Sequence, residues 1–192
     1  KVLAIGPLII GVDPARFGDD RTAIVRRKSR AVFDLEVYEK RSTMEIAGIV
    51  HSIIKRENPA QVAVDVGGLG AGVVDRLLEL GHDSVVVPIN FGSASLDPQR
   101  FLNRRAEMWW NLRDWLDGDM PVMIPDRDDL HTDLCAPQYK YDSNSRRKLE
   151  SKDEIKKRGF RSTDCADALA LTFAEPLIIE ETELDERPSI VD

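Results

Sequence analysis

Long apolar runs are missing from this 192-residue sequence. None approaches the roughly 20 residues that a helix needs to cross a bilayer, so the sequence predicts no membrane segment. The apolar opening at residues 2–12 is interrupted by Gly6 and Pro7 and continues directly into a patterned segment, which argues against a secretion signal. We therefore expect a protein that is not secreted and does not bind a membrane.

Cysteine is nearly absent, since Cys135 and Cys165 are the only two. Their spacing matches neither a zinc site nor a disulfide framework, which fits a reducing compartment. A chain of this length is long enough for one well-buried domain and short for two.

A net positive charge is also lacking, because 34 acidic residues outnumber 27 Lys and Arg and the formal net charge is −7. Its distribution is uneven: residues 175–192 hold seven acidic residues and one basic residue, so this tail accounts for −6 of the total. Residues 140–161 instead carry nine Lys or Arg against four acids. This stretch is either a solvated surface or a phosphate-binding one, because local charge supports phosphate contact without proving it.

The first half of the chain alternates short apolar runs with helical patterns. Strands are predicted at residues 8–12, 22–25, 31–38, 61–66 and 84–89. A helix is predicted to begin at the capping box of Ser42 and Glu45 and to end at Asn58-Pro59. After a glycine-rich turn at residues 67–72, a second helix at residues 73–80 is closed by Gly81. The predicted order is therefore β-β-β-α-β-α-β.

The second half is less regular. A long helix is predicted at residues 98–117, a polar hairpin at 138–149 with its turn at 142–145, and a last helix at 163–174 that Thr163 or Ser162 could cap. Residues 175–192 are expected to form an acidic tail or linker. The predicted division is one domain at 1–174 followed by this tail.

Acidic residues occur where the pattern predicts buried strands. Asp13 ends the first strand and Asp65 lies within the fourth, where an unpaired carboxylate would be costly to bury. If these strands are neighbours, both carboxylates can share a cation, and the last helix can add Asp164 or Asp167. Such oxygen donors suit Mg²⁺ or Mn²⁺. Taken singly, each Asp also fits a turn, a cap or an ion pair.

Several motifs then follow one another along residues 8–174. They are Ile10-Gly11-Val12-Asp13-Pro14-Ala15, Gly18-Asp19-Asp20-Arg21-Thr22-Ala23, Ala63-Val64-Asp65 with Gly67-Gly68-Leu69-Gly70, Glu150-Ser151-Lys152 with Arg158, and Ser162-Thr163-Asp164-Cys165-Ala166-Asp167-Ala168-Leu169. As a set, they resemble the nuclease domain of phage terminase large subunits.

The resemblance implies an α/β fold of the ribonuclease-H-like type, in which three antiparallel strands are followed by parallel strands in one mixed sheet flanked by helices. It also implies an endonuclease that cuts concatemeric double-stranded viral DNA during genome packaging, in the cytoplasm of the host cell. The implied partners are DNA, an ATPase motor domain, the portal and the small terminase subunit.

The resemblance assigns roles to particular residues. Asp13 and Asp65 would be the first two ligands of two Mg²⁺ or Mn²⁺ ions, with Asp13 bridging them. The third acid is Asp164 or Asp167, and we prefer Asp164. Two such ions would activate a water and stabilise the leaving 3′ oxygen. Lys152 would contact the phosphate or stabilise the site between metal occupancies. The residues expected to hold the DNA backbone are Arg146, Arg147, Lys148 and Arg158.

Other polar residues receive weaker assignments. Asp20 is interpreted as a turn cap or a partner of the site acids. The three histidines, His51, His82 and His131, are interpreted as isolated surface or helix residues rather than metal ligands.

One family feature is missing: no Gly-x-x-x-x-Gly-Lys-Ser/Thr phosphate loop occurs, so this chain is not the packaging motor. We expect an excised nuclease domain, which its abrupt start at Lys1 favours, or a stand-alone relative. The competing interpretations are another nuclease of this fold such as a junction resolvase, a catalytically silent DNA-docking domain, and an ATPase of the actin-like or sugar-kinase type. The last is suggested by Gly11-Val12-Asp13 with Thr22, but it usually needs two duplicated domains.

Overall fold

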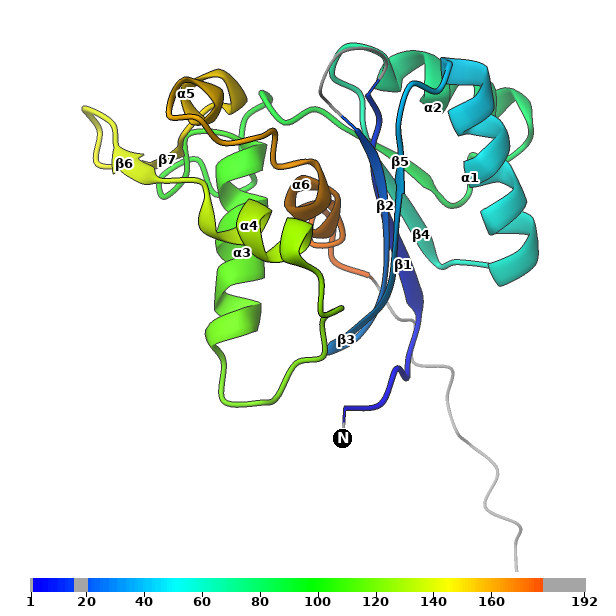
Figure 1. Ribbon diagram of the computed structural model, residues 1–192, viewed down its shortest axis with the longest axis horizontal. Helices are drawn as coiled ribbons and strands as arrows, with labels where there is room; N and C mark the ends of the chain where they lie inside the picture. The colour runs from blue at the N-terminus through cyan, green and yellow to red at the C-terminus, as the bar shows by residue number, and fades with distance from the viewer. Residues whose placement is uncertain (1, 16–20, 178–192) are drawn as a thin grey trace, which may run out of the picture.

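A five-stranded mixed sheet forms the centre of the protein (Figure 1). The computed structural model describes residues 2–15 and 21–177. The strands are β1 (Leu8–Asp13), β2 (Thr22–Lys28), β3 (Ala31–Tyr38), β4 (Gln61–Asp65) and β5 (Val86–Ile89). They lie in the order β3-β2-β1-β4-β5, where β1, β2 and β3 pair antiparallel and β1, β4 and β5 pair parallel. The predicted ribonuclease-H-like fold class is confirmed.

Two helices cover one face of the sheet, α1 (Thr43–Glu57) and α2 (Gly70–Glu79) (Figure 1). The predicted capping box of α1 is present, with Ser42 as N-cap and Glu45 as its partner. The helix ends at Asn58, whose φ of 46° lies in the left-handed region. The apolar side of α1 is buried with the facing side chains of β1 and β4 in one core cluster.

Three helices cover the opposite face, α3 (Arg104–Asp117), α4 (Asp128–Cys135) and α6 (Asp164–Leu171) (Figure 1). All eight residues of α6 are buried, which is the pattern of a helix surrounded by protein. It lies directly against β1: a Cβ added at Gly11 would stand 1.9 Å from the carbonyl oxygen of Ala168. This close approach places the first turn of α6 beside the end of β1.

The predicted hairpin is confirmed as β6 (Tyr139–Tyr141) and β7 (Arg147–Leu149), with a turn between Asp142 and Ser145. It leads into a short helix that was not predicted, α5 (Lys152–Lys157), which begins with a capping box formed by Ser151 and Glu154. The hairpin and α5 together form a projection at one side of the molecule (Figure 1).

Two further differences concern helices on the α3 side. The predicted start of the long helix at residue 98 is wrong, because Asn103 caps α3 and the helix begins at Arg104. Phe101, expected on the helical face, instead forms an isolated β-bridge with Arg147 and is buried there. The whole of α4 was not predicted.

The domain division at residues 174 and 175 stays a prediction, and residues 178–192 lie outside the described part of the chain. Glu175 forms an ion pair with Arg104 of α3, with 2.7 Å between Oε1 and Nη2. Within the described residues, no helix combines the length and the apolar character needed to span a membrane.

A candidate carboxylate site for divalent metals

Two neighbouring parallel strands bring Asp13 and Asp65 to the same edge of the sheet. Val12 of β1 lies opposite Val64 of β4, so the aspartate that follows each valine is the next position along each strand. Both carboxylates are buried, at 4% and 9% exposure. The backbone N–H of Gly67 donates to Oδ1 of Asp65 at 3.1 Å, which orients that side chain.

The last helix and α5 complete the cluster. Asp164 and Asp167 lie in the first turn of α6 and are 1% and 0% exposed. Lys152, the first residue of α5, places its Nζ 2.7 Å from Oδ2 of Asp13, 3.3 Å from Oδ1 of Asp164 and 3.4 Å from Oδ2 of Asp167. The five residues predicted to be catalytic, from four different elements, therefore lie together.

The four carboxylates of this cluster outnumber its one ammonium group, that of Lys152. Burial raises the pKa of Asp13 to about 8, with Lys152 opposing the shift and the carboxylates of Asp167, Asp164 and Asp65 adding to it. Burial likewise raises the pKa of Asp65. Burial disfavours the Lys152 ammonium, but the three carboxylates beside it outweigh this and raise the pKa of Lys152 well above its ordinary value. The site therefore favours additional positive charge.

Asp167 is held by donors of the protein itself. Arg105 of α3 donates from Nε to Oδ1 at 2.9 Å and from Nη2 to Oδ2 at 3.2 Å. Nε1 of Trp109 donates to Oδ1 at 2.7 Å, and the Thr163 hydroxyl donates to Oδ2 at 2.8 Å. Burial acts to raise the pKa of Asp167, but Arg105, Lys152 and Trp109 lower it to about 2. Its oxygens are thus already occupied.

Asp164 has fewer donors. The backbone N–H of Arg21 donates to its Oδ2 at 2.9 Å, and the Ser162 hydroxyl donates to its Oδ1 at 2.5 Å, beside Lys152. If the Lys152 ammonium withdraws, Asp164 regains acceptor capacity that Asp167 lacks.

The cap of α6 differs from the prediction. Thr163 stands at the N-cap position without a capping hydrogen bond from its side chain. Instead, Oδ2 of Asp133 in α4 accepts the backbone N–H of Cys165 at 2.9 Å. Burial raises the pKa of Asp133 to about 6. The predicted cap by Thr163 or Ser162 is therefore wrong, because a residue of another helix takes that role.

The donor set fits hard divalent cations. Carboxylate oxygens are the ligands that Mg²⁺ and Mn²⁺ prefer, and the Lys152 ammonium is a cation surrounded by the carboxylates of Asp13, Asp164 and Asp167. As the side chains stand, no three His, Cys, Asp or Glu residues within the described ranges are arranged to hold a metal ion together. A cation bound among the carboxylates of Asp13, Asp164 and Asp167 would take the place of the Lys152 ammonium.

The basic residues predicted to hold DNA differ in their surroundings. Arg146 forms an ion pair with Asp142 at 2.7 Å, and Arg158 forms one with Glu150 at 2.6 Å. The guanidinium of Arg147 lies 4.6 Å from the ring centroid of Trp110. Lys148 is exposed.

Two of the three histidines contact each other. The interpretation of His51 and His82 as isolated is wrong, because Nδ1 of His51 lies 2.7 Å from Nε2 of His82. His131 lies 3.9 Å from the thiol of Cys135, measured at Nε2. Asp20 lies outside the described residues.

Sequence reasoning missed Arg105, Trp109 and Asp133. Arg105 and Trp109 lie in a helix with many charged residues, where an arginine is expected at the surface and a tryptophan in the core. Asp133 belongs to a helix that was not predicted at all. Only their contacts with α6 reveal their part in the site.

No protein-family model matches the chain, and no curated protein matches its sequence. Solved structures do match its fold. The nuclease domain of the large terminase subunit gp2 of bacterial virus Sf6 has a TM-score of 0.78 at 20% identity, covering 91% of each chain. The large terminase nuclease of thermophilic phage G20c, with bound magnesium, has a TM-score of 0.65 at 17% identity, covering 88% of this chain and 81% of that one. The nuclease domain of Thermus phage P74-26 has a TM-score of 0.60 at 16% identity, covering 87% and 78%. This chain therefore has the fold of the nuclease domains of phage large terminase subunits.

Proposed function

We propose that this chain is a divalent-metal-dependent endonuclease that cuts concatemeric double-stranded viral DNA during genome packaging. The observation that carries the proposal is the convergence of Asp13, Asp65 and Asp164 at one edge of the sheet, beside a single lysine ammonium. An excess of buried carboxylates over cations is costly unless cations are bound. The fold shared with terminase nuclease domains supports phosphodiester hydrolysis as the class of reaction.

The proposed cofactors are two Mg²⁺ or Mn²⁺ ions. A mutant of the Sf6 domain has been solved with manganese and beta-thujaplicinol, and the G20c nuclease with magnesium and with cobalt. In this chain Asp13, Asp65 and Asp164 would hold the ions, since the oxygens of Asp167 are engaged by Arg105, Trp109 and Thr163. When bound, such ions supply an activated water and charge stabilisation at the leaving oxygen.

The residues of the chain then have separate tasks. Asp13 and Asp65 are fixed by adjacent strands, so their separation is set by the sheet. Asp167 anchors the first turn of α6 to α3 through Arg105 and so positions Asp164. The side chain of Lys152 is 30% exposed while its carboxylate partners are buried, so its ammonium can neutralise them without metal or turn toward a phosphate.

The proposed setting is the cytoplasm of the host cell, where the domain would work with an ATPase motor domain, the portal and the small terminase subunit. This proposal rests on the shared fold and on the resemblance of the motifs.

Plasmid cleavage tests the proposed activity. The purified chain is incubated with supercoiled plasmid in Mn²⁺, Mg²⁺ or EDTA, alongside Asp13→Asn and Asp65→Asn. Asp75→Asn is the matched control, because Asp75 is an exposed residue of α2. We expect nicking and linearisation with metal by the wild type and the control, and neither by the two site variants.

A folded wild-type chain that cuts in neither metal would contradict the proposal and favour the silent docking domain. Cutting that persists in Asp13→Asn would equally remove the carboxylate site from the mechanism. Tight ATP binding without cleavage would favour the kinase-like alternative.

A further inference from the structure

The β6–β7 hairpin has two chemically different faces. Tyr139 and Tyr141 project on one face, with Leu149 and Arg147 as their cross-strand partners. The ring of Tyr139 lies edge-on to that of Trp110 in α3, with 5.0 Å between the ring centroids. The same indole is covered by the Arg147 guanidinium. This face is therefore the one that packs the hairpin onto α3.

The other face carries two lysines directly opposite each other. Lys140 of β6 pairs with Lys148 of β7 in the hairpin register. Like charges at such positions destabilise a strand pair. Neither charge is well neutralised: Nζ of Lys140 is 4.0 Å from Oε1 of Glu154, and its side chain is 67% exposed. Glu154 is also occupied in capping α5.

No ion pair of Lys148 is found within the described residues. The arginines nearby differ in this respect, because Arg146 and Arg158 are each paired with an acid and Arg147 is stacked on Trp110. The two lysines of this face thus share one nearby acid, Glu154, so their positive charge is only partly neutralised, and a polyanion would relieve their repulsion.

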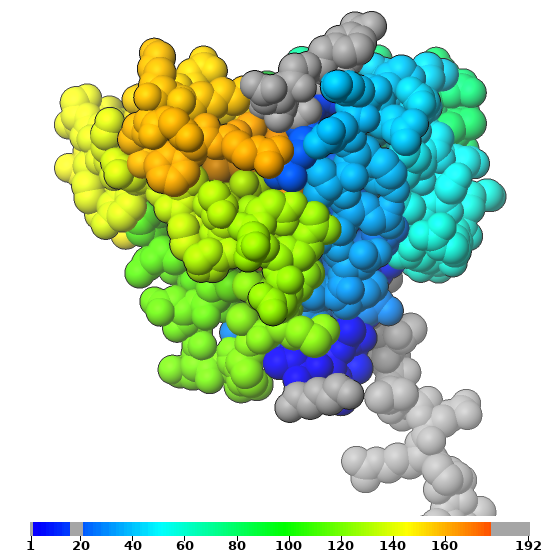
Figure 2. Space-filling view, viewed as in Figure 1, coloured from blue at the N-terminus to red at the C-terminus, as the bar shows by residue number. Residues whose placement is uncertain are grey.

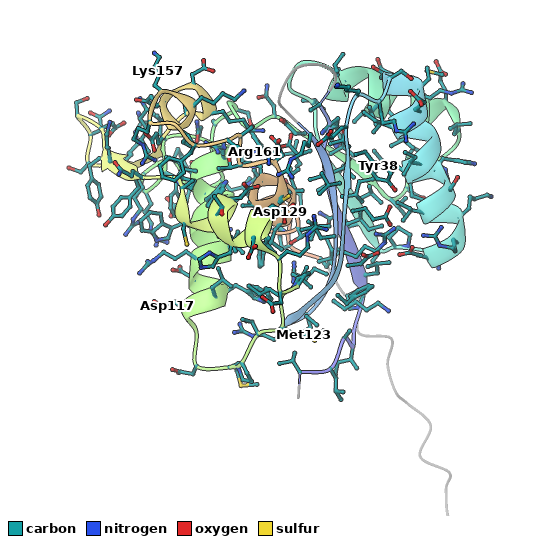
Figure 3. All side chains as sticks on the ribbon, viewed as in Figure 1. Tyr38, Asp117, Met123, Asp129, Lys157 and Arg161 are labelled. Carbon is teal, nitrogen blue, oxygen red and sulfur yellow. The ribbon has the colours of Figure 1, made fainter. Side chains whose placement is uncertain are left out.

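The lysine face is close to the carboxylate site along the chain. Only residues 149–151 separate Lys148 from Lys152, so their Cα atoms lie at most about 14 Å apart. Each strand of duplex DNA carries one phosphate per about 3.4 Å of helix axis. Figure 2 shows the hairpin and α5 side by side at the surface, and Figure 3 shows Lys157 of α5 projecting outward from the same part of the molecule. Lys148 therefore lies within about four nucleotides of a strand engaged at Lys152.

We propose that Lys140 and Lys148 together bind the phosphodiester backbone of the DNA strand that enters the carboxylate site. This inference rests on the proposed nuclease function and sharpens it: the phosphate contacts come from the lysine face, while Arg146, Arg147 and Arg158 maintain the shape of the hairpin and its junction with α5. Backbone contacts of this kind position DNA without reading its sequence.

Salt-dependent binding tests the assignment. Fluorescence anisotropy of the full chain with a labelled short duplex, in EDTA so that cutting is absent, gives the slope of log K against log salt. Lys140→Gln/Lys148→Gln is compared with Lys40→Gln/Lys55→Gln, which removes the same charge from exposed lysines elsewhere. We expect the hairpin variant to lower the magnitude of the slope by about 1.8, or 0.9 for each lost contact, and the control to leave it unchanged.

Lys140→Arg/Lys148→Arg should keep the wild-type slope, because a guanidinium also binds phosphate. Thermal unfolding should show no loss of stability in the Gln variant, since it removes a like-charge pair. If the wild-type chain cuts plasmid but the Gln variant keeps the wild-type slope, this inference is overturned and the nuclease proposal stands. An equal change in the control would overturn it as well, and a wild type that neither binds nor cuts would overturn both.

Discussion

Arg105 of α3 donates hydrogen bonds to both carboxylate oxygens of Asp167 in α6, at 2.9 Å from Nε to Oδ1 and 3.2 Å from Nη2 to Oδ2. Its remaining Nη1 donates to the backbone carbonyl of Glu150 at 2.7 Å. One guanidinium therefore joins α3, α6 and the segment that leads to Lys152. Through these bonds, Arg105 links Asp167 to the backbone of Glu150, two positions before Lys152.

Replacing Arg105 by Met should strongly destabilise the protein. The buried Asp167 would lose its main counter-charge, and breaking a buried ion pair in this way costs about 3–5 kcal/mol. Denaturant unfolding monitored by circular dichroism measures the loss. Arg113→Met is the matched control, because Arg113 lies on the same helix with an exposed side chain and should change stability by less than about 1 kcal/mol. A similar, small effect in both variants would show that the Arg105 pair contributes little.

Asn substitutions at Asp164 and Asp167 should separate a metal ligand from an anchor. Asp164→Asn should lower metal-dependent cleavage by at least about 100-fold, the upper end of losses seen for outer-shell partners of metal sites, while the protein stays folded. Asp167→Asn places an amide NH₂ among the donors of Arg105, Trp109 and Thr163, so it should lower the free energy of unfolding by about 3 kcal/mol or more. Cleavage assays and denaturant unfolding of both variants check this. A stable but inactive Asp167→Asn, beside an active Asp164→Asn, would reverse the assignment.

The strand acids could be predicted from sequence because their signal is local. A carboxylate that ends or interrupts an apolar strand is conspicuous, and both Asp13 and Asp65 were found in this way. The start of α1 was predicted for the same reason, since the capping box of Ser42 and Glu45 spans only four residues. The pairing of β1 with β4 was only a condition of the prediction, because β2, β3 and α1 lie between these strands along the chain.

The contacts that hold the site together could not be predicted, because they join residues far apart in sequence. Arg105 and Asp167 are 62 positions apart, and Asp133 and Cys165 are 32 apart. In α3 the buried residues include Arg104, Arg105 and Glu107, whose types read as surface positions in a helical pattern. The short helix α5 has too few residues to show a hydrophobic period, although its capping box of Ser151 and Glu154 was a usable signal.

Gly11→Ala should prevent α6 from packing normally on β1. The added Cβ would lie 1.9 Å from the carbonyl oxygen of Ala168, so the helix or the strand must shift. We expect a loss of at least about 3 kcal/mol, the upper end for overpacked cores. Denaturant unfolding measures it.

Gly48→Ala is the control for this substitution. Gly48 lies inside α1, and an added Cβ there meets no atom within 4 Å. Alanine restricts the unfolded chain and favours the helix, so this variant should gain about 0.5–1 kcal/mol. A loss at Gly48, or tolerance at Gly11, would contradict the packing described for the two faces of the sheet.

The hydrogen-bonded pair of His51 and His82 should make stability depend on pH. Burial, His51 and Lys55 lower the pKa of His82 below its ordinary value of 6.5. Below pH 6.5 the unfolded chain therefore takes up a proton that the folded chain refuses, and stability falls as the pH drops from 6.5 toward the lowered pKa. The slope for one such proton cannot exceed about 1.4 kcal/mol per pH unit.

Unfolding measured between pH 7.5 and 5.5 should show this loss in the wild type and a smaller one in His82→Gln. His131→Gln, at an exposed position of α4, should behave as the wild type does. Identical pH dependence in the three proteins would mean that the pKa of His82 is not lowered in the folded state.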